Sequence, residues 1–156
     1  MDKRLSLSIK LELVWWVVTV LLLAGILFPI YKTQTNYPFW YTNTLFIVVF
    51  ITFTRYIFLL KHTFLAWLQW AKVAIIFLCI PLLMYLIKVL HHFQRYLDGV
   101  GLQDVFSHLS YKGQVHMMNY VQAEVLFFGA ASIIVTILMA FRMLISFWRT
   151  RNRGTV

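Results

Sequence analysis

The sequence predicts an all-α membrane protein with four transmembrane helices, and three observations support that prediction. The chain has 156 residues, of which 62% are hydrophobic and only 12% are charged. Its mean hydropathy is +0.78. Its four long apolar stretches can each cross ~30 Å of hydrocarbon at about 1.5 Å per residue. A single soluble domain could not bury so much apolar surface, so the whole chain, 1–156, is expected to be one transmembrane domain.

The first predicted span covers residues 13–30. It follows a basic N-terminal segment and contains no small-x-small cleavage site that would indicate a signal peptide. Glu12 lies at the edge of this span, where it either complements the helix dipole or pairs with Arg55 or Arg142. Pro29 is expected to end the helix, because the residue before a proline is disfavoured in the α conformation.

The second predicted span covers residues 41–60 and contains one fixed charge, Arg55. A guanidinium this close to the end of a helix can snorkel to the interface, and its shallow depth favours this interpretation. The alternative is an arginine that faces the bundle and pairs with a carboxylate. Residues 61–72 are expected to form a short amphipathic segment on the membrane surface, or the extended ends of two long helices.

The third and fourth predicted spans cover residues 73–90 and 125–148. Pro81, in the middle of the third span, is expected to kink its helix. The fourth span is expected to continue a helix that begins near Gln114. One stripe of the fourth span consists of small residues, Gly129, Ser132, Thr136 and Ala140. Small residues let helices approach closely in lipid, so we expect this seam to pack against another helix of this chain or of a partner.

Residues 91–120 form the one sizeable segment predicted to lie outside the membrane. Asp98 and Gly99 indicate a turn at its start. Apolar residues then recur at i, i+3, i+4 and i+7, which predicts a short amphipathic helix that lies on the lipid surface, caps the bundle or binds a partner. These residues are Leu102, Val105, Phe106 and Leu109.

The basic residues predict how the chain is threaded. The formal net charge of +9 comes from residues that flank apolar segments. We therefore expect these basic residues to contact anionic lipid headgroups, and we do not expect them to bind nucleic acid. One side of the membrane would hold Lys3, Arg4, Lys10, Lys61, Lys72, Arg149, Arg151 and Arg153. The other side would hold Lys32, Lys88, Arg95 and Lys112. The positive-inside rule therefore places both termini in the cytoplasm and residues 91–120 outside.

The sequence shows no constellation typical of catalysis. The single cysteine, Cys79, lies in an apolar run, so a disulfide framework and a Cys-based zinc site are excluded. No serine lies in a nucleophile-elbow motif. The central layer of the four spans has no ionisable residue, which argues against ion-coupled transport. We therefore expect no cofactor and no enzymatic activity.

The histidines support only a weak alternative. His62 and His91 are predicted at opposite membrane faces, which excludes a bis-histidine haem within the core. An outer redox or metal site would have to use His91, His92, His108 and His116. Their spacing matches no zinc motif, so solvated interfacial histidines are the favoured interpretation.

Three segments resemble a family of small four-span bacterial membrane proteins. They are NYPFW at 36–40, FTRYIFLLKHTFLA at 53–66 and SFWRTRNRGTV at 146–156. The resemblance covers the whole chain. It implies a location in the bacterial inner membrane, and it brings no activity and no catalytic residues.

The favoured functional hypothesis is a non-catalytic integral membrane subunit, or accessory factor, of a larger inner-membrane complex. Its expected partners are membrane lipids and other integral membrane subunits. The alternative is a small transporter or lipid-binding protein in which Arg55 and Arg142 contact anionic headgroups. The candidate intramembrane charges are Glu12, Arg55, Lys72 and Arg142.

Overall fold

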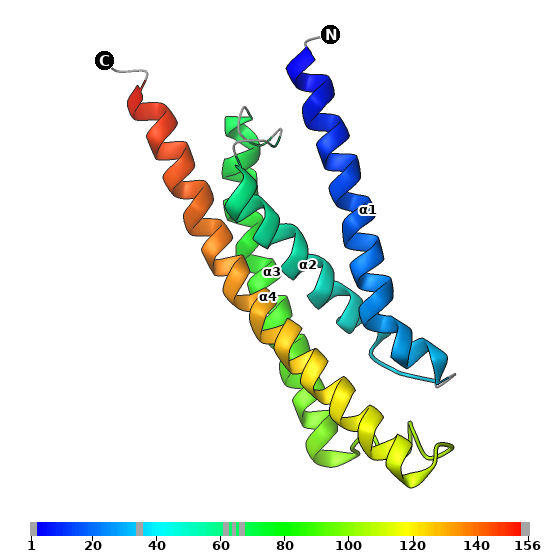
Figure 1. The fold of residues 1–156 in the computed structure, drawn as a ribbon. Coiled ribbons are helices and arrows are strands. Elements are labelled where there is room, and N and C mark those ends of the chain that lie inside the picture. The colour runs from blue at the N-terminus through cyan, green and yellow to red at the C-terminus, as the bar shows by residue number, and fades with distance from the viewer. Residues whose placement is uncertain (1–2, 34–35, 61–62, 64, 66–67, 154–156) are drawn as a thin grey trace.

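The computed structural model describes residues 3–33, 36–60, 63, 65 and 68–153, and this part of the chain contains four α-helices and no β-strand. The helices are α1 (Lys3–Lys32), α2 (Trp40–Leu59), α3 (Gln69–Gly99) and α4 (Tyr111–Arg153). Each is long and apolar enough to cross a membrane. The predicted fold class is therefore confirmed, and the four helices mark the chain as a multi-pass membrane protein. Both termini lie at the same end of the bundle (Figure 1).

The helix α4 is the element on which the others assemble. It packs extensively along α3 and α2, whereas α1 contacts α2 and α4 much more sparingly. The main core lies between these helices and includes Phe46 of α2, Leu86 and Phe93 of α3, and Val121 and Val125 of α4. A smaller core, which includes Leu60, Cys79 and Met143, lies toward the other end.

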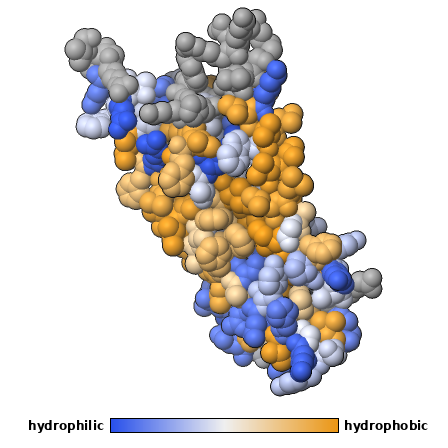
Figure 2. Space-filling model, in the orientation of Figure 1, coloured by the Kyte–Doolittle hydropathy of each residue, from blue (hydrophilic) through white to orange (hydrophobic). Residues whose placement is uncertain are grey.

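The helices α3 and α4 are longer than a membrane requires. With 31 and 43 residues, they measure about 46 Å and about 64 Å at about 1.5 Å per residue. Figure 2 shows the consequence: apolar side chains cover the middle of the molecule, and polar side chains gather at the end where α3 and α4 are joined. The prediction that the fourth span continues a helix from near Gln114 is confirmed, since α4 runs unbroken from Tyr111.

The two prolines within helices do not end them. The prediction that Pro29 ends the first helix is wrong, because α1 continues to Lys32. A proline removes one backbone hydrogen bond, and here only the last turn of α1 follows it. Thr33 closes that turn: its amide and its hydroxyl both donate to the carbonyl of Ile30, at 3.2 and 2.6 Å. Likewise, α3 continues through Pro81.

The segment between α3 and α4 also differs from the prediction, because residues 102–109 form successive turns rather than an amphipathic helix. The amides of Val100 and Gly101 both donate to the carbonyl of Tyr96, and Gly101 has a φ of 74° that turns the chain out of α3. The turns of residues 102–109 then reverse the chain between α3 and α4.

The apolar residues of this segment point inward. Leu102 and Phe106 are fully buried in the main core, and Val105 and Leu109 pack against it. These four residues therefore close the end of the bundle, which is the capping alternative among the three that the sequence left open, and they do not form the predicted partner-binding helix.

The predicted small-residue seam packs inside the chain. Gly129, Ser132 and Thr136 are buried, and Ala140 packs against the smaller core. A Cβ atom on Gly129 would lie 2.6 Å from Cδ1 of Leu90 and 3.2 Å from Cε2 of Phe46. The hydroxyls of the seam donate to carbonyls of α4 itself, Ser132 to Gly129 at 2.8 Å and Thr136 to Ser132 at 2.7 Å. The seam thus presents a smooth face to α2 and α3.

The prediction for residues 61–72 falls partly outside the described residues, which omit 61–62, 64 and 66–67. Leu65 is buried in the smaller core, and α3 begins at Gln69, so Lys72 lies in its first turn.

A bulkier residue at the seam should destabilise the bundle. Gly129→Val places methyl groups where Leu90 and Phe46 already lie, and overpacking costs about 1–3 kcal/mol. We expect a lower thermal unfolding midpoint in detergent. Gly25→Val is the matched control, because nothing lies within 4 Å of a Cβ atom at Gly25. Equal losses for the two variants would contradict close packing at the seam.

Candidate functional site

The first polar cluster joins α1 to α2 through an ion pair. Nη2 of Arg55 lies 2.6 Å from Oε2 of Glu12, and the two side chains are only 5% and 14% exposed. The hydroxyl of Tyr56 donates to the same carboxylate oxygen at 3.3 Å. The guanidinium also lies 5.7 Å from the ring centroid of Trp15 and 5.1 Å from that of Tyr56. These rings shield the pair and add cation–π attraction.

This geometry corrects the favoured interpretation of Arg55. A snorkelling arginine would extend its guanidinium toward water, whereas this one faces the bundle and has a carboxylate partner. An intramembrane charge is much less costly when a counter-charge lies within hydrogen-bonding distance. The sequence left Glu12 with Arg55 or Arg142 as possible partners, and the structure selects Arg55.

Arg142 performs a different task at the same end of α2. Its Nε donates to the carbonyl of Ile57 at 3.1 Å. Ile57 lies in the last turn of α2, where carbonyls have no partner within their own helix. Arg142 is half-buried and thus ties α4 to the end of α2.

Lys72 is the fourth predicted intramembrane charge. It is buried in the first turn of α3, and its Nζ donates to Oε1 of Gln69 at 3.4 Å. Of the four predicted charges, Glu12 pairs with Arg55, and Arg142 of α4 contacts the end of α2. Lys72 lies in the first turn of α3.

A second polar cluster, which the sequence analysis missed, joins α2 to α4 near the opposite end of the bundle. Nδ2 of Asn43 donates to Oε2 of Glu124 at 2.8 Å, and both side chains are buried. One turn before Glu124, the hydroxyl of Tyr120 donates to the carbonyl of Ile26 in α1 at 2.7 Å. The signal in the sequence was an asparagine near the start of the second predicted span, and Glu124 lies one residue before the fourth predicted span.

Tyr37 closes this second cluster from the turn between α1 and α2. Its side chain is buried and stacks edge-on against Phe39 and Trp40, with ring centroids 6.0 and 5.6 Å apart. Burial raises the pKa of the Tyr37 phenol well above its usual value, and the charge of Glu124 raises it further. The phenol therefore stays neutral at physiological pH.

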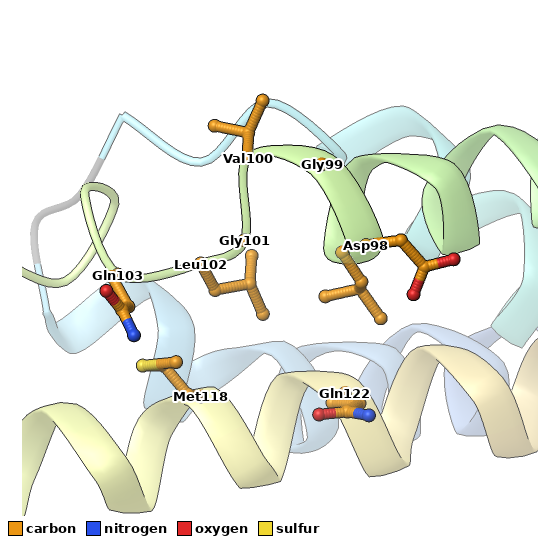
Figure 3. A pocket seen from close by; sticks show the side chains of 9 residues that line it. Asp98, Gly99, Val100, Gly101, Leu102, Gln103, Met118 and Gln122 are labelled. Carbon is orange, nitrogen blue, oxygen red and sulfur yellow. The ribbon is translucent and has the colours of Figure 1, made fainter.

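An open pocket lies at the tip of the α3–α4 hairpin (Figure 3). Its volume is about 390 Å³, and it lies between residues 97–103 and the side chains of Met118 and Gln122 on α4. Asp98 contributes the one acidic side chain of the lining. The pocket is therefore partly open, and its lining mixes polar and apolar side chains.

The four histidines between residues 91 and 120 do not form a cluster. His91, His92 and His116 are exposed, and the ring of His108 contacts the carbonyl of Thr33 at 2.9 Å. Among the described residues, no group of three His, Cys, Asp or Glu side chains could hold a metal ion.

Comparison of the chain with protein-family models, with curated proteins and with solved structures gave no match. The resemblance to the four-span bacterial family therefore stays a prediction, and function has to be argued from the chain's own residues.

Breaking the Glu12–Arg55 pair should destabilise the protein strongly. Glu12→Gln or Arg55→Met leaves one buried charge unpaired, at a cost of about 3–5 kcal/mol. The double variant removes both charges, so it should lose less stability than the two single variants together. Thermal unfolding in detergent measures each loss. Lys10→Met is the control, because Lys10 is an exposed charge on the same helix. If Glu12→Gln behaved like Lys10→Met, the ion pair would have no structural role.

Proposed function

We propose that the protein is a non-catalytic integral membrane subunit, or accessory factor, of a larger complex in the bacterial inner membrane. The first support is the use made of its embedded charges. Arg55 is neutralised by Glu12, and Arg142 binds a backbone carbonyl of α2. Both arginines thus hold helices of this chain together.

The observation on which the proposal depends is the sparse packing of α1. Polar contacts fix this helix to its neighbours at two levels, through Glu12 near one end and the Ile26 carbonyl near the other. The large apolar side chains between these levels point mostly outward: Leu13, Val14, Trp16, Val17, Val20, Leu21 and Leu22 are exposed. Because packing sets the position of a helix in lipid, a helix with so few neighbours is suited to receive one from another chain.

The proposed orientation places both termini in the cytoplasm. The termini lie at one end of the bundle (Figure 1), and the exposed Arg149 and Arg151 lie on the last turns of α4 at that end. Basic residues next to spans favour the cytoplasmic side. The α3–α4 turn then lies outside.

A photo-cross-linking residue at Leu21 should capture a partner subunit. Leu21 of α1 is 66% exposed, and Phe77 of α3, the control position, is 68% exposed. We expect a cross-linked protein of constant mass from Leu21 and lipid adducts from Phe77, identified by mass spectrometry after purification in mild detergent. Lipid adducts alone from both positions, or cross-links only to a second copy, would contradict the proposal.

A second candidate function is lipid binding at Arg142. The described hydrogen bond of Arg142 uses Nε, and its terminal nitrogens lie on a half-buried side chain at the basic end of the bundle. A guanidinium in this setting suits a lipid phosphate. Arg55 is less suited, since Glu12 already neutralises it.

Under this alternative, Arg142→Ala should reduce the anionic lipid that co-purifies from vesicles containing phosphatidylglycerol. The double variant Glu12→Gln/Arg55→Met is the control, because it keeps the net charge and should retain the lipid. Lipid mass spectrometry measures both, and unchanged lipid in Arg142→Ala would exclude this role for Arg142.

A further inference from the structure

The bundle buries two carboxyl groups, those of Glu12 and Glu124, and only the first has a charged partner. Glu12 has Arg55 as counter-charge. Glu124 is only 7% exposed, and among the described residues its hydrogen-bond partner is the neutral amide of Asn43. Three buried oxygen atoms of this second cluster have no partner among the described residues: Oε1 of Glu124, Oδ1 of Asn43 and the hydroxyl of Tyr37.

Among the described residues, no basic side chain forms an ion pair with Glu124. The turn between α1 and α2 contributes the phenol of Tyr37, and α4 itself contributes that of Tyr120. The helix α2 contributes a neutral amide, Asn43. The basic residues toward this end are all exposed: Lys32 of α1, Lys88, His91, His92 and Arg95 of α3, His108 of the turn, and Lys112 and His116 of α4. A buried carboxylate in such a setting is costly and becomes neutral unless a counter-ion reaches it.

One proton accounts for two of the unpaired oxygens. The amide of Asn43 already donates from Nδ2 to Oε2. The remaining atoms are the amide oxygen of Asn43 and Oε1 of Glu124. Both are hydrogen-bond acceptors while Glu124 is ionised, so they cannot bond to each other. A proton on Oε1 converts it into a donor for which Oδ1 is the free acceptor. The result is a reciprocal acid–amide pair with two hydrogen bonds.

We propose that Glu124 is a proton-binding site, in which a proton taken up from water at the end of the bundle that holds the α3–α4 turn forms an O–H bond on Oε1 and locks α4 to α2 through Asn43. The reaction is the addition of one proton to one carboxylate, and no other bond changes. The site thereby couples the packing of α2 on α4 to proton activity on that side of the membrane. This inference does not depend on the proposed partner complex.

Infrared spectroscopy of the full chain in detergent tests the protonation state directly. The protein has only five Asp and Glu residues, so a protonated carboxyl band at neutral pH can be assigned. We expect this band in the wild type and in Glu12→Gln, and its loss in Glu124→Gln. Asn43→Ala should keep the band at a higher frequency, because the carboxyl group loses its amide partner. No band in the wild type, or a band that survives Glu124→Gln, would overturn the proposal.

The pH dependence of unfolding gives a second, independent readout. The folded chain holds this proton and the unfolded chain releases it above about pH 4.3, where an ordinary glutamic acid ionises. Stability should therefore fall as pH rises from there, with the folding equilibrium constant decreasing by up to about tenfold per pH unit, and level off once the folded state ionises. Glu124→Gln, which mimics the protonated form, should remove this slope. If wild-type stability instead rose with pH and with added sodium or potassium, the site would bind a metal cation and the proposal would fail.

Discussion

The absence of water around the spans is the constraint on which this structure depends. In lipid, each polar or charged group must find its partner within the protein, because an unsatisfied group costs several kcal/mol. Glu12 and Arg55 meet this requirement for their charges by pairing across α1 and α2, although Oε1 of Glu12 and Nε of Arg55 have no hydrogen-bond partner among the described residues. Arg142 meets it at a backbone carbonyl that the end of α2 leaves open. These contacts also determine which helices adjoin, since each polar group must lie beside its one partner.

The two ends of the bundle each bury a carboxyl group, and the groups that surround it differ between the ends. At the end that holds the termini, the carboxylate of Glu12 pairs with the guanidinium of Arg55 beside aromatic rings, so the two charges cancel each other. At the other end, the carboxyl of Glu124 meets only an amide and two phenols that are neutral in their ordinary state. A charge can be cancelled there only by a proton or by an incoming cation. The second end is therefore the one able to respond to its surroundings.

Apolar packing is extensive among α2, α3 and α4 and sparse between these helices and α1. The helices α2, α3 and α4 share the main core, and the turns between α3 and α4 close it by burying Leu102 and Phe106. The helix α1 adds little to this core and is fixed mainly through polar contacts. Polar contacts fix points along a helix, whereas packing fixes its whole face. An adjoining helix from another chain would supply the face that α1 lacks.

The sequence by itself determined the features that depend on length and hydropathy alone. Four apolar stretches of sufficient length could only be four spanning helices, and the small stripe around Ser132 could only be a site of close approach. Features that depend on distant partners were decided by tertiary structure. Whether Arg55 turns inward depends on Glu12, 43 positions earlier, at the same depth on another helix, and Glu124 became part of a site only because α4 packs beside Asn43. The periodicity of residues 102–109 was real, but it described which side chains point into the core. Whether those residues form a helix was decided by the reversal of the chain between α3 and α4, which they make in successive turns.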